Sequence, residues 1–201
     1  MIVLGSYSVG KTSLVDRIVY KEFKCNETTI GASFNNINHD DKYNLNIWDT
    51  AGQERYRSIS RIYFKDVHIV LMVYNMNNID TLIDIESYWI NDFYKSHYLN
   101  ENKKCIFYVV GNLADSYYHE NNIPIDITLN NSRKKILDKI ARDYPQVKFF
   151  EVSAKSGYGI QHLEDNIFED VDAINSNPQQ VESEEDYFLD DDSRKLVRRC
   201  C

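Results

Sequence analysis

The sequence predicts an α/β domain built on a mainly parallel, six-stranded sheet. Short apolar runs rich in β-branched and aromatic residues alternate with longer stretches of helical periodicity, which is typical of parallel sheets flanked by helices. A short polar link at 39–42 joins two of these runs and suits an antiparallel hairpin, whereas the other links are long enough for crossovers. We therefore expect one antiparallel strand in an otherwise parallel sheet.

Six strands and five flanking helices are predicted in chain order. The strands are expected at Ile2–Leu4, Ala32–Asn38, Tyr43–Trp48, Val67–Tyr74, Cys105–Val110 and Lys148–Val152. The helices are expected at Thr12–Tyr20, around Ser58–Tyr63, and at Thr81–Lys95, Ser132–Tyr144 and Ile160–Ile174. These elements predict one domain over residues 1–174.

The composition is that of a soluble globular protein, with 201 residues of which 43% are hydrophobic and 27% charged. A net charge of -8 argues against nucleic-acid binding, because contacts with phosphates need basic clusters. The longest apolar stretches, such as 67–74, are far shorter than the about 20 residues that cross a bilayer. We expect no signal peptide, and four cysteines without metal-ligand spacing favour a reducing, cytosolic setting.

Residues 175–201 are predicted to form a disordered tail. This stretch has seven carboxylates within 182–192 and few apolar groups, so it cannot bury enough surface to offset its ordering entropy. The acidic run is expected to act as a solvated spacer. The tail then turns basic at 194–199 and ends in Cys200 and Cys201.

A glycine-rich loop follows the first predicted strand. The stretch 5–12, GSYSVGKT, matches G-x-x-x-x-G-K-[ST] and opens a helix. In such loops the backbone N–H groups and the helix N-terminus bind phosphate, the lysine reaches the β- and γ-phosphates, and the hydroxyl of Thr12 can bind Mg²⁺. The loop therefore indicates nucleoside triphosphate binding, against the alternative of a glycine turn beside a solvated lysine, but it does not select a nucleotide.

Two downstream segments supply the further groups that phosphate chemistry needs. Thr29 stands 17 residues after Thr12, and the stretch 48–54, WDTAGQE, lies at the end of the third predicted strand. There a carboxylate can hold the Mg²⁺ shell, a glycine amide can sense the γ-phosphate, and a glutamine can orient the attacking water. A bland surface turn would not require this order of residue types.

The stretch 109–115, VVGNLAD, follows the fifth predicted strand. Its Asn112 and Asp115 could form a turn by bonding to their own backbone, or could recognise the polar edge of a ligand. Read with the two motifs upstream, the second interpretation is favoured.

These motifs together resemble the small GTPases and, within them, the Rab family, with a faint lean to the endosomal branch. IGASF at 30–34, WDTAGQERYRSI at 48–59 and the terminal Cys-Cys carry the resemblance, which covers about residues 1–174 and the last two residues. It implies a Ras-like P-loop fold, GTP or GDP as ligand, Mg²⁺ as cofactor and hydrolysis of GTP to GDP. Position by position, the implied nucleotide-binding residues are Gly5, Ser8, Val9, Gly10, Lys11, Thr12, Ser13, Thr29, Gly52, Asn112, Asp115, Ser153, Ala154 and Lys155.

The same resemblance assigns further roles. Gln53 is expected to orient the catalytic water, and Thr12, Thr29 and, through water, Asp49 are expected to hold Mg²⁺. The aromatic residues Phe34, Trp48 and Tyr63 match the triad on which Rab effectors rest, although ordinary core or hairpin packing is the alternative for aromatics at such positions. The stretch 153–155 matches the family's S-A-K element, whose backbone supports the guanine oxygen.

Among the departures from the family pattern, two concern the nucleotide site directly. The guanine motif N-K-x-D reads Asn112-Leu113-Ala114-Asp115, so Leu113 can lie against the base but supplies no ammonium to tie the phosphate loop to the ribose. Loss of a charge-assisted bond of roughly 1.5 to 3 kcal/mol predicts retained guanine preference with nucleotide binding weakened about ten- to a hundredfold. Tyr7 stands where the family has a small residue, so hydrolysis is expected to be slow, unless its ring turns out to solvent.

The terminal Cys200 and Cys201 resemble the doubly prenylated end of many Rabs, against the alternative of unmodified thiols. Two lipid chains anchor a protein stably, and the preceding basic residues would attract anionic lipid. The implied partners are an exchange factor, a GTPase-activating protein, escort and GDP-dissociation-inhibitor type proteins, effectors and a membrane. A monomer is expected, in the cytosol and on the cytoplasmic face of an endosomal or other vesicular membrane.

The sequence leaves three candidate functions to compare. The first is a GTP-hydrolysing switch that recruits effectors to membranes in vesicle trafficking. The second is a pseudo-GTPase or slow-hydrolysing scaffold, which Tyr7 and Leu113 favour and the complete phosphate site opposes. The third, a P-loop kinase for a small metabolite, lacks a lid or acceptor-site signature and has no use for terminal cysteines.

Overall fold

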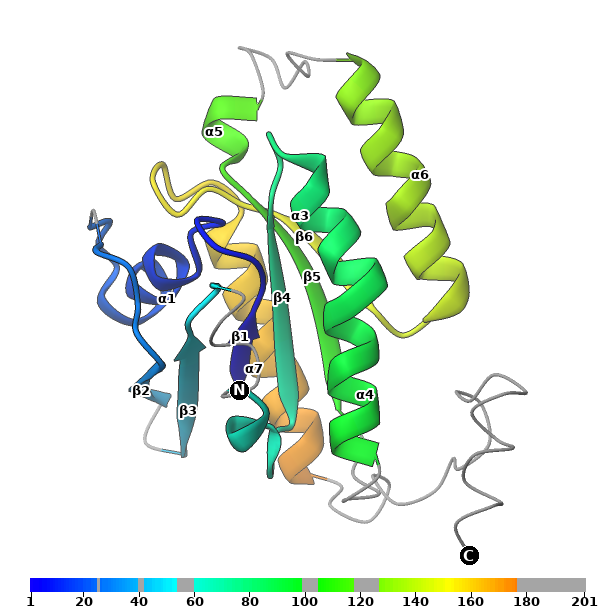
Figure 1. The fold of residues 1–201 in the computed structure, drawn as a ribbon. Coiled ribbons are helices and arrows are strands. Elements are labelled where there is room, and N and C mark those ends of the chain that lie inside the picture. Colours follow the sequence, from blue (N-terminus) through cyan, green and yellow to red (C-terminus); the bar gives the residue numbers. More distant parts are fainter. Residues whose placement is uncertain (25, 40–41, 54–59, 99–104, 118–126, 177–201) are drawn as a thin grey trace, which may run out of the picture.

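The computed structural model describes residues 1–24, 26–39, 42–53, 60–98, 105–117 and 127–176 and confirms the predicted α/β architecture. Six strands form one sheet in the order β2-β3-β1-β4-β5-β6 (Figure 1). The β2–β3 pair is antiparallel and every other pair is parallel, as the short link at 39–42 predicted.

The strands agree with their predicted ranges to within about two residues at each end. They are β1 (Ile2–Leu4), β2 (Ala32–His39), β3 (Tyr43–Thr50), β4 (Ile69–Asn75), β5 (Ile106–Asn112) and β6 (Lys148–Glu151). β3 and β5 extend further than predicted. Asp49 of the WDTAGQE stretch therefore lies within β3, and Asn112 of the VVGNLAD stretch is the last residue of β5.

The helices among the described residues differ more from their predicted ranges. They are α1 (Lys11–Tyr20), the 3₁₀ helix η2 (Arg61–Phe64), α3 (Ile79–Asp84), the π-helical turn η3 (Ile85–Trp89), α4 (Ile90–Tyr98), α5 (Ala114–Tyr117), α6 (Ile127–Asp143) and α7 (Ile160–Ser176). Of the helix predicted around Ser58–Tyr63, residues 58–59 lie outside the described ranges, Ser60 is α-helical, and the 3₁₀ helix at 61–64 follows it. The short α5 was not predicted, whereas α3, η3 and α4 replace a single predicted helix.

A π-helical turn lies within the helical region at 79–98. Trp89 and Ile90 are both buried and pack in one core with Phe93. Because they precede Phe93 by four and three residues, the three side chains lie on one face of the helix.

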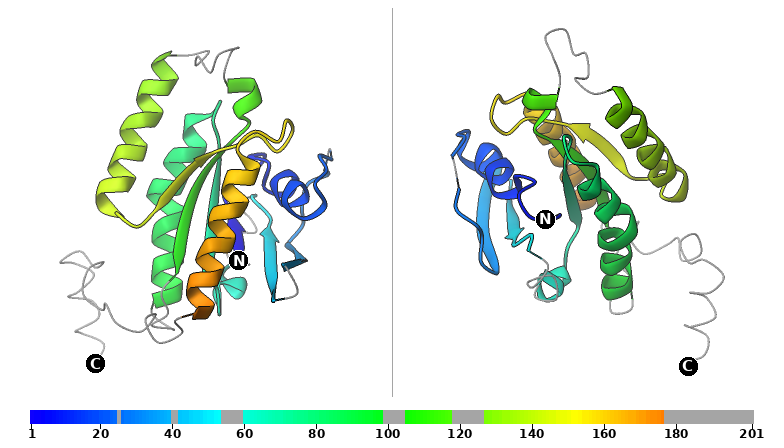
Figure 2. Two further views of the ribbon diagram at one scale, coloured as in Figure 1. Left: turned by 180° about the vertical axis from the view of Figure 1, so that it is seen from behind. Right: turned by 45° about the horizontal axis from the view of Figure 1, so that its top comes forward.

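Helices cover both faces of the sheet, as Figure 2 shows from behind, where α7 crosses the sheet on the side opposite to α4 and α6. Alternate residues of each central strand supply the two cores. Met72 packs with the core of α3, α4 and α6, whereas its neighbours Leu71 and Val73 pack with the core of α1 and α7. All three are fully buried, and burial of each such side chain contributes about 1.5–3 kcal/mol.

The site lies where the parallel strands end. The loops that follow β1, β3, β5 and β6 meet at one edge of the sheet, and the strand order reverses beside β1, where ligands of open α/β sheets bind. No helix within the described residues combines the length and the apolar character that crossing a membrane demands.

A candidate nucleotide-binding site

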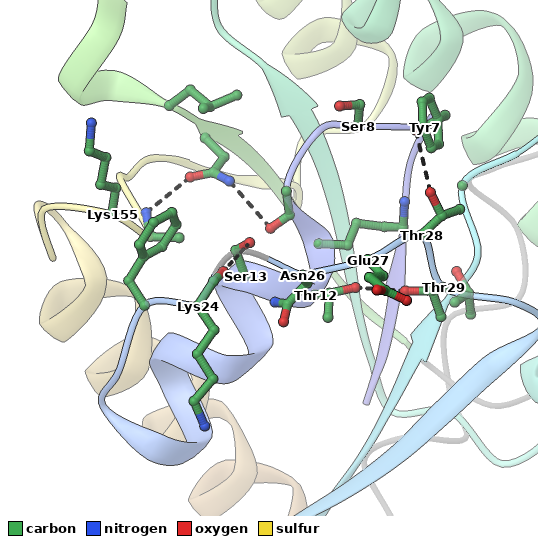
Figure 3. Close-up of a pocket in the computed structure, with 18 of the residues that line it drawn as sticks. Tyr7, Ser8, Thr12, Ser13, Lys24, Asn26, Glu27, Thr28, Thr29 and Lys155 are labelled. Carbon is green, nitrogen blue, oxygen red and sulfur yellow. Dashed lines mark hydrogen bonds between the residues drawn. The ribbon is translucent and has the colours of Figure 1, made fainter.

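A cavity of about 340 Å³ opens at this edge of the sheet. Eleven of the predicted nucleotide-binding residues line it, although they come from five separate segments of the chain: Ser8, Gly10, Lys11, Thr12, Ser13, Thr29, Gly52, Asn112, Asp115, Ala154 and Lys155. Figure 3 shows how the loop before α1, the segment around Thr29 and the Lys155 loop surround this space.

The loop after β1 has the backbone that close contact with phosphate requires. Gly5 and Gly10 have φ values of 141° and 84°, in the region that favours glycine, and Ser8 also has a positive φ of 62°. A Cβ at Gly10 would lie 2.4 Å from the Asn112 amide nitrogen, and one at Gly52 would lie 2.4 Å from the Lys11 ammonium. Any side chain at either glycine would therefore displace another part of the site.

Lys11 lies at the centre of the phosphate end and is buried. Its ammonium donates hydrogen bonds of 3.0 Å to the carbonyl oxygens of Gly5 and Ser6, which hold the side chain across its own loop. Burial lowers the pKa of Lys11 to about 8, while the negative charge of Asp49 opposes this shift. An anionic ligand beside this ammonium would relieve the desolvation cost.

The residues predicted to hold Mg²⁺ form a connected chain of oxygens. The hydroxyl of Thr12 donates to the Asp49 carboxylate at 2.7 Å. It also lies 2.8 Å from the hydroxyl of Thr29 (Figure 3). Since the single proton of Thr12 goes to Asp49, Thr29 must be the donor in the second bond. Two hydroxyls and a carboxylate are thus gathered from α1, the segment before β2, and β3.

This oxygen set fits a hard cation. The Oδ1 atom of Asp49 is buried, and no described residue donates a hydrogen bond to it. Burial is the main reason why the pKa of Asp49 is raised, and the hydrogen bond from Thr12 and the charge of Lys11 act against it. No cluster of three His, Cys, Asp or Glu side chains that could hold a metal occurs in the described ranges, so hydroxyl, phosphate and water oxygens would have to complete the coordination.

The opposite end of the cavity is organised around Asn112, which is buried at the end of β5. Its amide nitrogen donates to the carbonyls of Val9 at 3.0 Å and Gly10 at 3.4 Å, and its amide oxygen accepts from the Ala154 N–H at 3.1 Å. One side chain therefore joins the phosphate loop to the loop after β6.

Asp115 stands beside the same loop. Its Oδ1 accepts a 2.6 Å hydrogen bond from the hydroxyl of Ser153, and its Oδ2 lies 3.9 Å from the Lys155 ammonium. Ser153 in turn accepts from the Ser156 N–H at 3.0 Å, so its hydroxyl closes the loop and braces the carboxylate. A carboxylate held in this way can accept two neighbouring N–H groups of a ligand edge.

Leu113 lines the cavity between these two residues and has a φ of 70°. This left-handed conformation is unfavourable for a leucine, and the neighbouring bonds of Asn112 hold the backbone in place. An apolar side chain at this point can cover the face of a ligand but forms no ion pair.

Several predicted site residues lie just outside the cavity lining. The Gly5 carbonyl accepts from Lys11, and the Val9 carbonyl accepts from Asn112. Ser153 donates to Asp115, and Asp49 accepts from Thr12, so these two contact lining residues. Gln53 follows Gly52 directly but is not among the lining residues. Cys200 and Cys201 lie outside the described residues.

Sequence reasoning missed one side of the cavity. Phe23, Lys24, Asn26, Glu27 and Thr28 all line it, and Phe23 is 40% exposed. An exposed aromatic ring in a polar cavity suits stacking against a planar ligand. The available signal was a lone aromatic residue within 21–28, a segment without periodicity.

The predicted aromatic triad is brought together on the adjacent surface. The ring centroids of Phe34 and Trp48 are 5.0 Å apart, and those of Trp48 and Tyr63 are 4.5 Å apart. Phe34 is 52% exposed, which excludes core packing, while its register with Trp48 across β2 and β3 is also that of hairpin packing. Ile62, next to Tyr63, is 72% exposed.

A phosphate-binding loop on a mixed sheet, with hydroxyl, carboxylate and amide groups in these places, defines a P-loop nucleotide-binding protein. The model of the Ras family matches residues 1–173. The Ras-related protein Rab7 of Glycine max is 34% identical over 168 residues, covering 80% of this chain and 75% of that protein. The Ras-related protein Rab7 of Pisum sativum is 31% identical over 179 residues (85% and 81%), and the GTP-binding protein YPTC5 of Chlamydomonas reinhardtii is 31% identical over 199 residues (95% and 87%).

The chain therefore belongs to the Ras family of small GTPases and, within it, to the Rab GTPases, as the sequence predicted. Members of this family bind GTP and GDP, typically with Mg²⁺, and hydrolyse GTP.

Proposed function

We propose that this chain is a GTP-dependent switch that hydrolyses GTP slowly and, in its GTP form, recruits effectors to a vesicular membrane. The observation that carries the proposal is the single cavity with a phosphate end at Lys11 and a base end at Asp115. Hydrogen bonds of Asn112 to the phosphate loop and to the loop after β6 connect these two ends.

At the phosphate end, backbone N–H groups of 8–13 and the Lys11 ammonium would hold the phosphates. Thr12, Thr29 and, through water, Asp49 would hold Mg²⁺, which would neutralise the charge that develops on the phosphates. Gln53 would orient the water that attacks the γ-phosphate. The Gly52 N–H would sense that phosphate and transmit its presence to the residues that follow.

At the base end, the two N–H groups on the guanine edge would donate to Asp115, and the backbone of the loop at 153–155 would support the guanine oxygen. Adenine presents no such pair of donors, so the carboxylate selects guanine. Leu113 would cover the base without binding the rest of the nucleotide, and this favours retained specificity with fast release.

The output of the switch would pass through the exposed aromatic triad beside the site. In the β2–β3 pair, Phe34 lies opposite Trp48, and the neighbouring Ser33 lies opposite Asp49. Two members of the triad are therefore adjacent in the strands to a residue that would hold Mg²⁺. Prenylated Cys200 and Cys201 would anchor the chain on the membrane, where exchange factor, activating protein, escort protein and dissociation inhibitor would act on it.

A second function, a nucleotide-loaded scaffold, is favoured by the position of Tyr7. Its ring is 54% exposed and lines the cavity, and its phenol oxygen lies 3.4 Å from the Thr28 hydroxyl (Figure 3). A ring between the phosphate loop and the segment before Thr29 would obstruct the approach of an activating residue. Measuring phosphate release with and without an activating protein separates the scaffold from the switch.

The decisive test of the proposed function is the identity of the nucleotide that co-purifies with the full chain. We expect GDP or GTP in the protein after mild purification, and competition titrations that rank GDP and GTP well above ATP. Equal affinity for ATP would contradict the proposed base recognition.

A further inference from the structure

We propose that Arg17 is a positioning residue of the base site, a proposal that rests on the proposed guanine recognition. Arg17 lies on α1, six residues after Lys11, and does not line the cavity. Its guanidinium nevertheless binds the loop after β6 that carries the base contacts.

Three carbonyl oxygens accept from this one side chain. The Nε–H donates to the Ala154 carbonyl at 2.7 Å, and the two terminal nitrogens donate to the carbonyls of Lys155 and Lys21 at 2.8 Å each. A planar guanidinium directs its donors in fixed directions, so three bonds from it restrict both segments more than three separate contacts would.

The bonds to Ala154 and Lys155 set the orientation of two consecutive peptide groups. In a trans peptide the C=O and N–H point in opposite directions, so fixing the Ala154 carbonyl toward α1 directs the Lys155 N–H away from it. On the N-terminal side, the Ala154 N–H is held by the Asn112 amide oxygen. Arg17 and Asn112 therefore hold the loop from its two sides.

The bond to Lys21 extends the restraint to a second wall of the site. Lys21 caps α1 with a left-handed φ of 59°, and its N–H bonds to the Arg17 carbonyl, so backbone and side chain of Arg17 both hold this turn. The turn leads directly to Phe23, the aromatic residue that lines the cavity. One guanidinium thus fixes the relative position of the Ala154 loop and the segment that carries Phe23.

Arg17 gains importance because Leu113 supplies no cation to the site. With leucine at this position, hydrogen bonds from Asn112 and Arg17 join the base loop to the phosphate loop and its helix. Loss of Arg17 should therefore loosen recognition of the base, while the phosphate end, held by Lys11 and Thr12, stays intact.

The experiment compares dissociation of fluorescent GDP from the full chain and from three variants at fixed Mg²⁺ concentration. We expect Arg17→Met to release GDP about tenfold faster or more, and Arg17→Lys, which keeps the charge without the planar fork, to give an intermediate rate. Arg142→Met, at an exposed arginine near the end of α6, is the matched control and should stay within twofold of wild type.

A second readout separates positioning from general support of the fold. The affinity of Arg17→Met for ADP, which uses the phosphate end alone, should be unchanged, so that the preference for GDP over ADP falls about tenfold. Equal weakening of both nucleotides, or GDP release within twofold of wild type, would overturn the role of Arg17. If Arg17→Met does not fold, the rate of GDP release from Arg17→Lys tests the proposal instead. A wild-type chain that shows no preference for GDP over ADP would instead overturn the proposed guanine site itself.

Discussion

The phosphate end and the base end of the cavity are built in different ways. At the phosphate end the glycine loop and the lysine that crosses it are local in sequence, and the hydroxyl of Thr12 bonds to a carboxylate only 37 residues away. At the base end the groups that would contact the ligand are held by residues distant in sequence. Asn112 is about 100 residues from the loop it bonds, and Arg17 is 137 residues from Ala154.

This difference decides how each end tolerates change. The phosphate end combines burial of Lys11 with glycines that leave no room for a Cβ, so a substitution there should abolish binding. The base end is a network of individually modest hydrogen bonds, so a substitution there should change specificity or release rate in steps. The chain has replaced a residue at the base end, Leu113, while the phosphate motif is complete.

The largest effect is expected from Lys11→Met, which would break the phosphate end. Methionine keeps the apolar stem but removes the ammonium that would pair with two phosphates, and such charge-assisted bonds are the strong ones. We expect GDP affinity to fall by about a hundredfold or more, which corresponds to about 3 kcal/mol. Fluorescence titration measures it, with a melting curve to verify folding. Lys134→Met, on the exposed side of α6, is the control, and a loss of less than tenfold in Lys11→Met would contradict the assignment.

The next effect concerns the base end and should change specificity as well as affinity. In Asp115→Asn an acceptor oxygen becomes a donor nitrogen, which suits the second carbonyl of xanthine instead of the amino group of guanine. We expect GDP affinity to fall by about thirtyfold or more and xanthosine diphosphate to bind more tightly than GDP.

Competition against fluorescent GDP measures this exchange of preference. Asp138→Asn, at an exposed carboxylate on α6, controls for the loss of one negative charge. An Asp115→Asn protein that still prefers GDP would place base recognition elsewhere.

The two ends also differ in how far the sequence could predict them. Lys11, Thr12 and Asp49 were predicted because phosphate and Mg²⁺ chemistry demands particular residue types at fixed spacing, and the spacing is visible in the chain. Phe23 and Arg17 were not predicted. Both act through position alone, an aromatic ring in an irregular segment and a guanidinium bonded to distant carbonyls, and neither leaves a pattern in the sequence.

The fold shows the same contrast. The mainly parallel sheet and the antiparallel hairpin were predicted from alternating apolar runs and one short link, which depend on local sequence. The π-helical turn at 85–89 was missed because the prediction used the regular α-helical period, from which such a turn departs. The short helix 114–117 was missed because it begins inside the base motif, whose residues also read as a turn.

A smaller effect would sharpen the comparison by restoring the missing cation. Leu113→Lys should slow GDP release about tenfold, since a charge-assisted bond contributes roughly 1.5 to 3 kcal/mol and part of it is lost to side-chain ordering. Stopped-flow chase of fluorescent GDP gives the rate. Leu113→Met, which lengthens the side chain without charge, should leave the rate close to wild type. Equal rates for Leu113→Lys and Leu113→Met would show that the leucine does not weaken the site.

The smallest effect is expected at the boundary between the two loops, where Tyr7 meets Thr28. Tyr7→Ser removes the ring from the cavity and should speed single-turnover GTP hydrolysis several-fold without changing GDP affinity by more than about twofold. The reason is steric: the ring lines the cavity beside the residues that would position water, and it bonds to the exposed segment before Thr29.

Tyr7→Phe keeps the ring but loses the bond to Thr28, so it separates obstruction from the hydrogen bond. If the ring itself obstructs hydrolysis, Tyr7→Phe stays slow; if the hydrogen bond restrains the segment, Tyr7→Phe speeds up like Tyr7→Ser. An unchanged rate in both variants would remove Tyr7 as the cause of slow hydrolysis and leave the intrinsic rate to the groups around Gln53.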